Sequence, residues 1–134
     1  MIVSTKGRYA LRVMIDLAEQ HKDERVPLKE IAERQGISQK YIEAIMTLLS
    51  KNHFVDAVHG KGGGYQLNKK PEEYKVGDIL RLTEGSLSPV ACLEKGAEVC
   101  PRKAECRTLP MWTKLDEIVE NYLDSISIAD LMKS

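Results

Sequence analysis

Three cysteines lie close together in the second half of this chain. Seven residues separate Cys92 from Cys100, and five separate Cys100 from Cys106. An α-helix does not bring residues at these intervals to one face, so the spacing predicts a loop that wraps around a bound group. Thiolates bind iron-sulfur clusters, zinc and copper(I), and the absence of a Cys-x-x-Cys pair disfavours zinc. The pattern therefore predicts a metal or redox site.

The cysteine loop also contains basic and acidic residues that can act on the thiols or on a bound metal. Basic side chains lower thiol pKa values and offset the negative charge of a cluster, and the loop contains Lys95, Arg102, Lys103 and Arg107. No fourth ligand is evident, because no histidine lies in the loop. The candidates are a partner subunit and the neighbouring Glu94, Glu98 and Glu105. The alternative interpretation is three free thiols on a surface loop.

Charge is distributed unevenly along the chain. The 134 residues are 43% hydrophobic, which is enough for one small domain with an appendage. Residues 1–70 hold 12 basic and 8 acidic residues, whereas residues 71–134 hold 8 and 12, so the halves carry +4 and −4. This asymmetry is typical of a basic nucleic-acid-binding part joined to an acidic sensing or assembly part. No membrane span or signal peptide is recognisable, which predicts a cytoplasmic protein without a membrane partner.

The stretch from Leu28 to Leu67 has the pattern of a helix-turn-helix. Apolar residues recur at helical spacing on both sides of Gly36, which permits a sharp turn. A second helix is expected from Leu28 to Gln35, and a third is expected after the cap residue Ser38. The third helix has an apolar inner stripe of Ile42, Ile45, Met46 and Leu49. The candidates for DNA contact on and beside its outer face are Ser38, Gln39, Lys40, Tyr41, Glu43 and Thr47.

These outer residues have the chemistry that distinguishes bases in a major groove. Gln39 can pair with adenine, Lys40 can meet guanine or phosphate, and Glu43 can accept from cytosine N4. An acidic side chain near phosphates is costly unless it is matched. Glu43 is therefore predicted to discriminate between sequences more than to add affinity.

A glycine-rich hairpin follows. Phe54 to Val58 alternates like a strand, Gly60 to Gly64 form a loop, and the chain returns from Tyr65 to Leu67. Such a wing can approach the minor groove, and its candidate contacts are His59, Gly60, Lys61 and Tyr65. A nucleotide-binding loop is the rival interpretation, and it fails because neither a Lys-Ser or Lys-Thr pair nor a helix follows the glycines.

Further helices are expected on both sides of this unit. The first runs from a cap at Ser4 or Thr5 to about His21, ahead of a polar loop at residues 22–25, and its Lys6, Arg8 and Arg12 are candidates for phosphate contact. Another helix spans residues 76–83 and ends at Gly85. The longest begins at Pro110, and its apolar stripe predicts a dimer interface at Trp112, Leu115, Ile118, Val119 and Tyr122. A short helix from Ile128 to Met132 is expected to fold back on that dimer.

The fold predicted is mainly α with a small β-hairpin wing. Residues 1–75 form a winged helix-turn-helix DNA-binding domain, and residues 76–134 form the cysteine-loop sensor and the long C-terminal dimerisation helix. No catalytic triad, carboxylate dyad or phosphate loop is present, so the protein is not expected to be an enzyme. An iron-sulfur or metal carrier that does not bind DNA is the alternative from another class.

Five motifs carry a resemblance over nearly the full length: STKGRYAL (4–11), ERQGIS (33–38), YIEAI (41–45), GKGGGYQL (60–67) and VGDILRLTEG (76–85). With them, the chain resembles the IscR, NsrR and CymR family of bacterial winged-helix regulators, and its cysteines resemble the IscR branch. The resemblance implies a homodimeric transcription factor on double-stranded operator DNA. It also implies a 2Fe-2S cluster on Cys92, Cys100 and Cys106, control of cluster biogenesis genes, and cluster donor proteins as partners.

Three positions depart from the family pattern. The fourth ligand of IscR-like members is a histidine, where this chain has Leu109, and their wing arginine corresponds to His59. The nitric-oxide-sensing branch uses an acidic residue near the N-terminus, where this chain has Arg8. A nitric-oxide, redox or cysteine-metabolism sensor of the same family remains the alternative. Cluster occupancy is expected to order the loop and thereby to set the spacing of the two recognition helices in the dimer.

Overall fold

Six helices and one hairpin make up the described part of the chain. The computed structural model describes residues 3–20 and 25–133. In chain order the elements are α1 (Thr5–Glu19), α2 (Leu28–Gln35), α3 (Gln39–Lys51), β1 (Val55–Val58), β2 (Gly64–Leu67), α4 (Val76–Glu84), α5 (Leu109–Ser125) and α6 (Ile128–Leu131). Short 3-10 turns lie at Pro71–Glu73, Ala91–Leu93 and Lys103–Glu105. The predicted fold class is confirmed, since the strands pair as one antiparallel hairpin among helices.

Most element ends agree with the sequence pattern. α1 ends at Glu19, and the predicted end near His21 lies outside the described residues, as do residues 22–24 of the predicted polar loop. Among the helices of residues 3–20 and 25–133, none combines the length and apolarity that crossing a bilayer requires.

The caps of the helix-turn-helix form as predicted. Ser38 accepts a hydrogen bond from the Tyr41 N–H at 3.2 Å, which satisfies a free donor at the start of α3. Gly36 ends α2 with φ at 66°, a left-handed conformation that a side chain would strain. This residue turns the chain sharply enough for α3 to cross α2.

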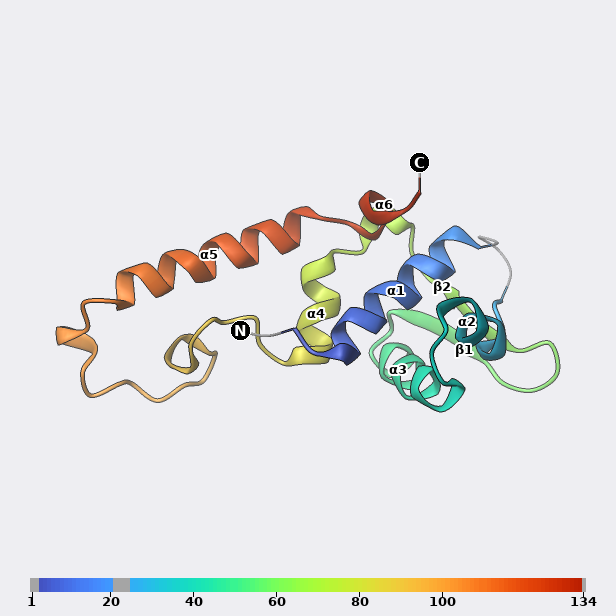
Figure 1. The fold of residues 1–134 in the computed structure, drawn as a ribbon, viewed down its shortest axis with the longest axis horizontal. Coiled ribbons are helices and arrows are strands. Elements are labelled where there is room, and N and C mark those ends of the chain that lie inside the picture. Colours follow the sequence, from blue (N-terminus) through green and yellow to red (C-terminus); the bar gives the residue numbers. More distant parts are fainter. Residues whose placement is uncertain (1–2, 21–24, 134) are drawn as a thin grey trace.

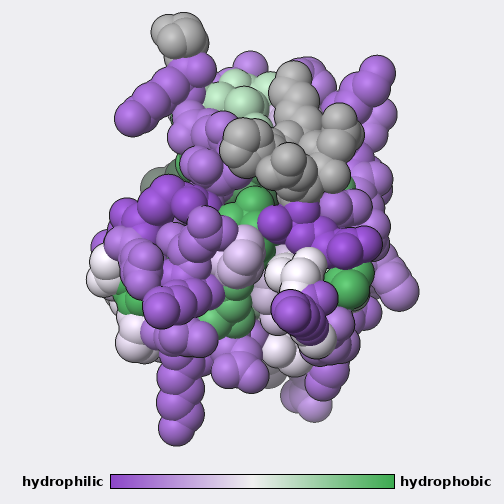
Figure 2. All heavy atoms as spheres, turned by 90° about the vertical axis from the view of Figure 1, so that its right-hand side faces the viewer, coloured by the Kyte–Doolittle hydropathy of each residue, from purple (hydrophilic) through white to green (hydrophobic). Residues whose placement is uncertain are grey.

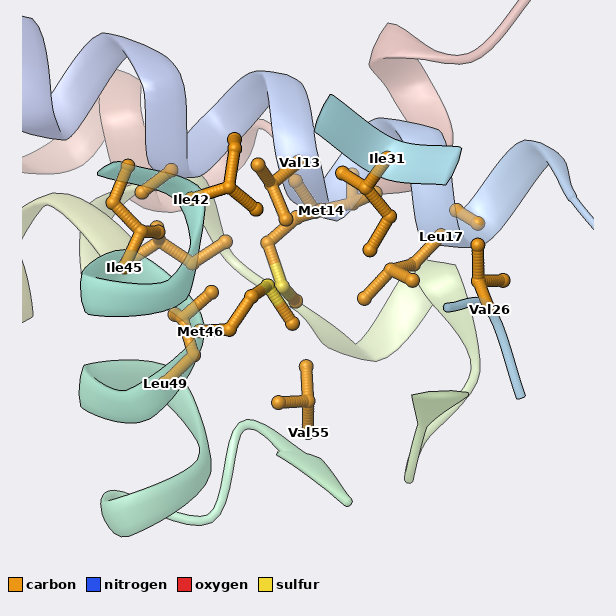
Figure 3. Close-up of a cluster of buried hydrophobic side chains, with 14 of the residues drawn as sticks. Val13, Met14, Leu17, Val26, Ile31, Ile42, Ile45, Met46, Leu49 and Val55 are labelled. Carbon is orange, nitrogen blue, oxygen red and sulfur yellow. The ribbon is translucent and has the colours of Figure 1, made fainter. Parts of the chain in front are cut away.

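One apolar core holds α1, α2, α3 and the hairpin together (Figure 3). Val13 and Met14 of α1 are fully buried and face the inner stripe of α3. The same core includes residues from beyond the hairpin, namely Tyr74, Ile79 and Ile128. α6 therefore packs on α1 of its own subunit, and its predicted contact with the dimer stays a prediction. The division into two parts near residue 75 stays a prediction.

A buried acid joins α1 to α2. Asp16 is only 3% exposed, and Arg34 donates to its two carboxylate oxygens at 2.9 and 3.0 Å. Gln35 Nε2 adds a third bond to Asp16 at 2.9 Å. A buried carboxylate needs such partners because desolvation penalises its charge. The network fixes the angle between the supporting helix and the first helix of the helix-turn-helix.

The hairpin is held to the rest of the subunit at two places. Tyr65 forms a bridge with Val26, and a Cβ on the adjacent Gly64 would lie 2.6 Å from the Val26 carbonyl oxygen, so only glycine fits there. The buried Tyr74 hydroxyl donates to the Phe54 carbonyl at 2.7 Å and accepts from the Asn68 N–H at 3.0 Å. The wing therefore leaves the core in a defined direction.

α5 is attached to the rest of the subunit through its C-terminal half. Arg81 of α4 makes a bidentate ion pair with Asp124, with both bonds at 2.9 Å, and also contacts Glu120. Beside this pair, Val119 and Leu123 pack against a small apolar cluster centred on Leu80. The N-terminal half of α5 extends away from α1 and α4, as Figure 1 shows.

Stability should depend on pH through this ion pair. Hydrogen bonds from Arg81 outweigh the effect of burial and lower the pKa of Asp124 below its ordinary value of 3.8. A carboxyl group with a lowered pKa stabilises the folded state above its unfolded pKa, and this contribution is lost as the pH falls through the folded pKa. We expect the difference in unfolding free energy between the wild type and Asp124→Asn to be largest near neutral pH and to shrink below about pH 4. Urea denaturation across this range measures it, and a difference independent of pH would contradict the assignment.

Candidate functional site

The predicted DNA-contacting residues of α3 lie on the side of the helix that the core leaves open. The inner stripe is at most 1% exposed, whereas Gln39, Lys40, Glu43 and Thr47 are exposed. Ser38 and Tyr41 are exposed as well, although each has a structural contact. Packing against the core therefore buries one face of α3 and leaves a polar face exposed. This is the arrangement that entering a groove requires.

The Tyr41 side chain of α3 lies against α1, where it contacts Tyr9. The edge of its ring meets the Tyr9 ring at 5.6 Å between centroids, and the Arg12 guanidinium lies 5.2 Å from the Tyr9 centroid. Arg12 also donates to the Gln35 carbonyl oxygen at the end of α2 at 2.5 Å. Arg12, a candidate for phosphate contact in the sequence, therefore binds the C-terminus of α2, where a cation is favourable. Lys6 and Arg8 are exposed at the start of α1.

The hairpin separates the predicted wing contacts into two groups. His59, Gly60 and Lys61 are exposed at the tip, where Gly60 and Gly62 have φ of 92° and 77°. Tyr65 lies instead within strand β2, where it is half-buried and opposite Ala57. Burial raises the pKa of Tyr65, and the charge of Glu43 raises it further, so its hydroxyl stays protonated at neutral pH. The end of the molecule that carries α2 and the wing is covered mostly by hydrophilic side chains (Figure 2).

Replacing Glu43 should relax base discrimination. We expect Glu43→Ala to reduce the preference at the base pair that Glu43 contacts by about 1–3 kcal/mol, because the carboxylate can no longer accept from a base amino group. Competition binding with single-base variants of an operator, selected from randomised DNA by the wild type, measures the preference. Glu33→Ala removes the same charge from the exposed side of α2 and serves as the control. If both variants keep the wild-type ranking of operators, Glu43 does not discriminate.

The three cysteines line one cavity beside the start of α5. Its volume is about 310 Å³, and its lining also includes Glu98, Lys103, Leu109 and Thr113. Cys92 lies in the 3-10 turn Ala91–Leu93, Cys100 in an irregular segment and Cys106 three residues before the start of α5. Across the described part of the chain, no three His, Cys, Asp or Glu side chains are grouped as they would be around one metal ion. The loop therefore places the three cysteines around one cavity, but it does not group their side chains as ligands of one metal ion.

The Cys106 thiol has a lowered pKa. Hydrogen bonds from the Thr108 hydroxyl, at 3.6 Å, and from the Thr108 backbone lower its pKa below the ordinary value of 9.0. A lower pKa increases the thiolate fraction, which is the form that binds metals and reacts with oxidants. The Cys106 thiol is therefore suited to either metal binding or redox chemistry.

The apolar stripe of α5 is only partly covered by its own subunit. Val119 packs against the α4 cluster, and Trp112 is half-buried. Leu115, Ile118 and Tyr122 remain 38%, 53% and 63% exposed, and Met111 extends this row with 54%. We define these four exposed residues as the α5 face. A row of large apolar side chains on one helix marks an interaction surface.

The model of the Rrf2 family, described as an iron-dependent transcriptional regulator, matches residues 3–134. The transcriptional regulator IscR of Aliivibrio salmonicida is 39% identical over 132 residues, which are 98% of this chain and 77% of that protein.

Two solved structures are similar over almost the whole chain. The global cysteine regulator CymR of B. subtilis is 34% identical, with a TM-score of 0.82 and coverage of 98% of this chain and 95% of that one. IscR of T. potens is 38% identical, with a TM-score of 0.75 and coverage of 98% and 85%. The similarity therefore includes the helix-turn-helix, the wing, the cysteine segment and α5.

Proposed function

Because this chain belongs to the Rrf2 family of transcriptional regulators, we propose that it is a homodimeric repressor whose operator binding is controlled by an iron-sulfur cluster. The cluster is of the 2Fe-2S type, and the regulated genes serve cluster biogenesis. The single observation that carries the proposal is the cavity that Cys92, Cys100 and Cys106 line together. The protein acts in the cytoplasm, where its operators lie, and cluster donor proteins are its transient partners.

Contact with DNA is assigned to α3 and the wing. The exposed polar face of α3 supplies base contacts through Gln39, Lys40 and Glu43, and the glycines near Lys61 let the hairpin backbone approach sugar and phosphate. Two copies joined along the α5 face would present two recognition helices to two half-sites. The basic first half of the chain supports this assignment, because phosphate contacts supply most of the affinity.

The cysteine cavity fits an iron-sulfur cluster in its donor chemistry. Three thiolates are the preferred ligands of such clusters, and the lining Lys103 offsets their negative charge. When bound, the cluster would supply a redox-active and oxygen-sensitive group. The protein contributes the thiolates, favours deprotonation of Cys106 through Thr108, and holds the last thiol at the start of α5.

A continuous set of contacts connects the cavity with the DNA-binding helices. Cys106 lies three residues before α5, Arg81 joins α5 to α4, and α4 packs on α1, which supports α3. Ordering of the loop at one end of α5 would therefore change how two α5 helices pack and how far apart the two α3 helices lie. Only a difference in cluster affinity between two dimer arrangements can produce such control.

Spectroscopy and DNA binding together test the proposal. Protein purified without oxygen should show visible absorption bands that Cys100→Ser loses, and the holo and apo forms should differ in operator affinity by about 5–150-fold. DNA fragments enriched by the wild type provide the operators. If holo and apo protein bind every enriched operator equally well, cluster control is wrong even where the absorption bands are present.

A cysteine-dependent regulator without a cluster is the second candidate. It is favoured by the similarity to CymR, a global cysteine regulator, and by the lowered pKa of Cys106. Such a protein would show no visible bands after anaerobic purification, and its operator affinity would respond to oxidation of Cys106. The same purified samples therefore distinguish the two candidates.

A further inference from the structure

The cavity at the three cysteines contains a fourth potential ligand. Its lining has one carboxylate residue, Glu98, besides the three thiols. We propose that Glu98 supplies the fourth ligand to the group that Cys92, Cys100 and Cys106 bind. This inference rests on the proposed function, because it assigns a ligand to the proposed cluster. In sequence, Glu94 and Glu105 were equal candidates, and neither lines the cavity.

The other lining side chains lack a suitable donor. Leu109, at the position of the family histidine, offers only hydrocarbon, and the ammonium group of Lys103 has no free electron pair. Thr113 offers a neutral hydroxyl, which is a weaker ligand than an anionic carboxylate. The histidines described, His53 and His59, belong to the region before and within the hairpin. Glu98 is therefore the lining residue beside the cysteines that brings an anionic ligand atom.

The position of Glu98 suits ligation together with Cys100. The two residues are on one irregular segment, so closing the loop around a cluster moves both together. Glu98 is exposed, and the intervening Val99 is 77% exposed, so no packed core must be broken for this movement. Ligation by Glu98 would complete a set of four ligands, which is the usual number for a 2Fe-2S cluster.

A carboxylate ligand has a functional consequence. Oxygen is a harder donor than sulfur and matches an iron-sulfur centre less well than thiolate. A cluster held by three thiolates and one carboxylate should consequently be lost more readily than one held by four thiolates. Such lability would let operator binding follow cluster supply closely.

Mössbauer spectroscopy of the full-length protein, reconstituted with 57Fe and sulfide without oxygen, tests the ligand. The wild type should show two different ferric sites in equal amounts, one with an oxygen ligand. Glu98→Gln should change the signal of that site and shorten the lifetime of the visible bands in chelator at least ~10-fold. Glu98→Cys should make the two sites alike and lengthen that lifetime. Glu94→Gln removes the same charge from the same loop and should match the wild type.

The outcomes separate this inference from the proposed function. If the wild type takes up no cluster, both are wrong. If the wild type takes up a cluster and both Glu98 variants give its spectrum and lifetime, the function stands and Glu98 is not a ligand. If Glu94→Gln alone changes the spectrum, the ligand is Glu94 and the assignment to Glu98 is overturned. Circular dichroism of the apo variants confirms that all of them are folded.

Discussion

Replacing Ile118 by glutamate is expected to convert the protein to a monomer and to lower its operator affinity at least ~100-fold. Ile118 lies in the middle of the α5 face, between Leu115 and Tyr122, and is 53% exposed in the single subunit. In a dimer joined along this face, the new carboxylate would be buried without a partner, which the interface cannot tolerate. Loss of the dimer also removes the avidity of two recognition helices on one DNA duplex.

Light scattering and operator binding measure this effect on the same samples. Glu117→Gln changes the charge by one unit at a neighbouring exposed position of α5 and should leave the dimer and the affinity intact. Circular dichroism distinguishes dissociation from unfolding. Because α5 has no fully buried residue in the subunit, the substitution should separate the dimer and leave the subunit folded. A dimeric Ile118→Glu variant with wild-type affinity would show that the α5 face is not the dimer interface.

Replacing Arg34 by alanine should destabilise the DNA-binding unit by roughly 2–4 kcal/mol. The Asp16 side chain is 2% exposed, whereas that of Arg34 is 35% exposed, so removing Arg34 leaves the charge of Asp16 buried without its counter-ion. The expected loss starts below the ~3–5 kcal/mol range for broken buried pairs and overlaps only its lower part, because Gln35 still donates to Asp16. The melting temperature should fall by about 10 °C.

Urea denaturation of the apo protein measures this loss. Lys29→Ala removes an exposed cation from the same helix, and its unfolding free energy should stay within about 0.5 kcal/mol of the wild type. The Asp16→Asn, Arg34→Ala double variant should recover part of the loss, since its buried group carries no charge. Equal stability of Arg34→Ala and the wild type would mean that the ion pair contributes nothing to the unfolding free energy.

The local pattern of the sequence was enough for the winged helix-turn-helix. Ser38 and Gly36 determine the start of α3 and the end of α2 through bonds and dihedral angles within a few residues. The apolar period of α3 determines which side faces the core, and the other side becomes the polar face by exclusion. Local signals of this kind survive in the tertiary structure because the core depends on the same period.

Long-range pairs could not be predicted in this way. Nothing near Asp16 in sequence indicates that it is buried against Arg34, and nothing near Arg12 indicates its bond to Gln35. The sequence pattern of α5 similarly predicted a single apolar face. In the structure Val119 packs against α4 of its own subunit, whereas Ile118 is exposed. A sequence pattern shows that a face is apolar but does not show what covers it.

By itself, the sequence determined the helices and the hairpin and the polar face of α3. It also determined that three thiols are the reactive groups of the second half of the chain. Only the tertiary structure decided that these thiols line one cavity, that Glu98 is the acidic residue lining it, and that α6 packs on α1. The physical reason is that periodicity and caps act over one or two helical turns. The position of a loop residue depends instead on how distant helices pack, which no local pattern records.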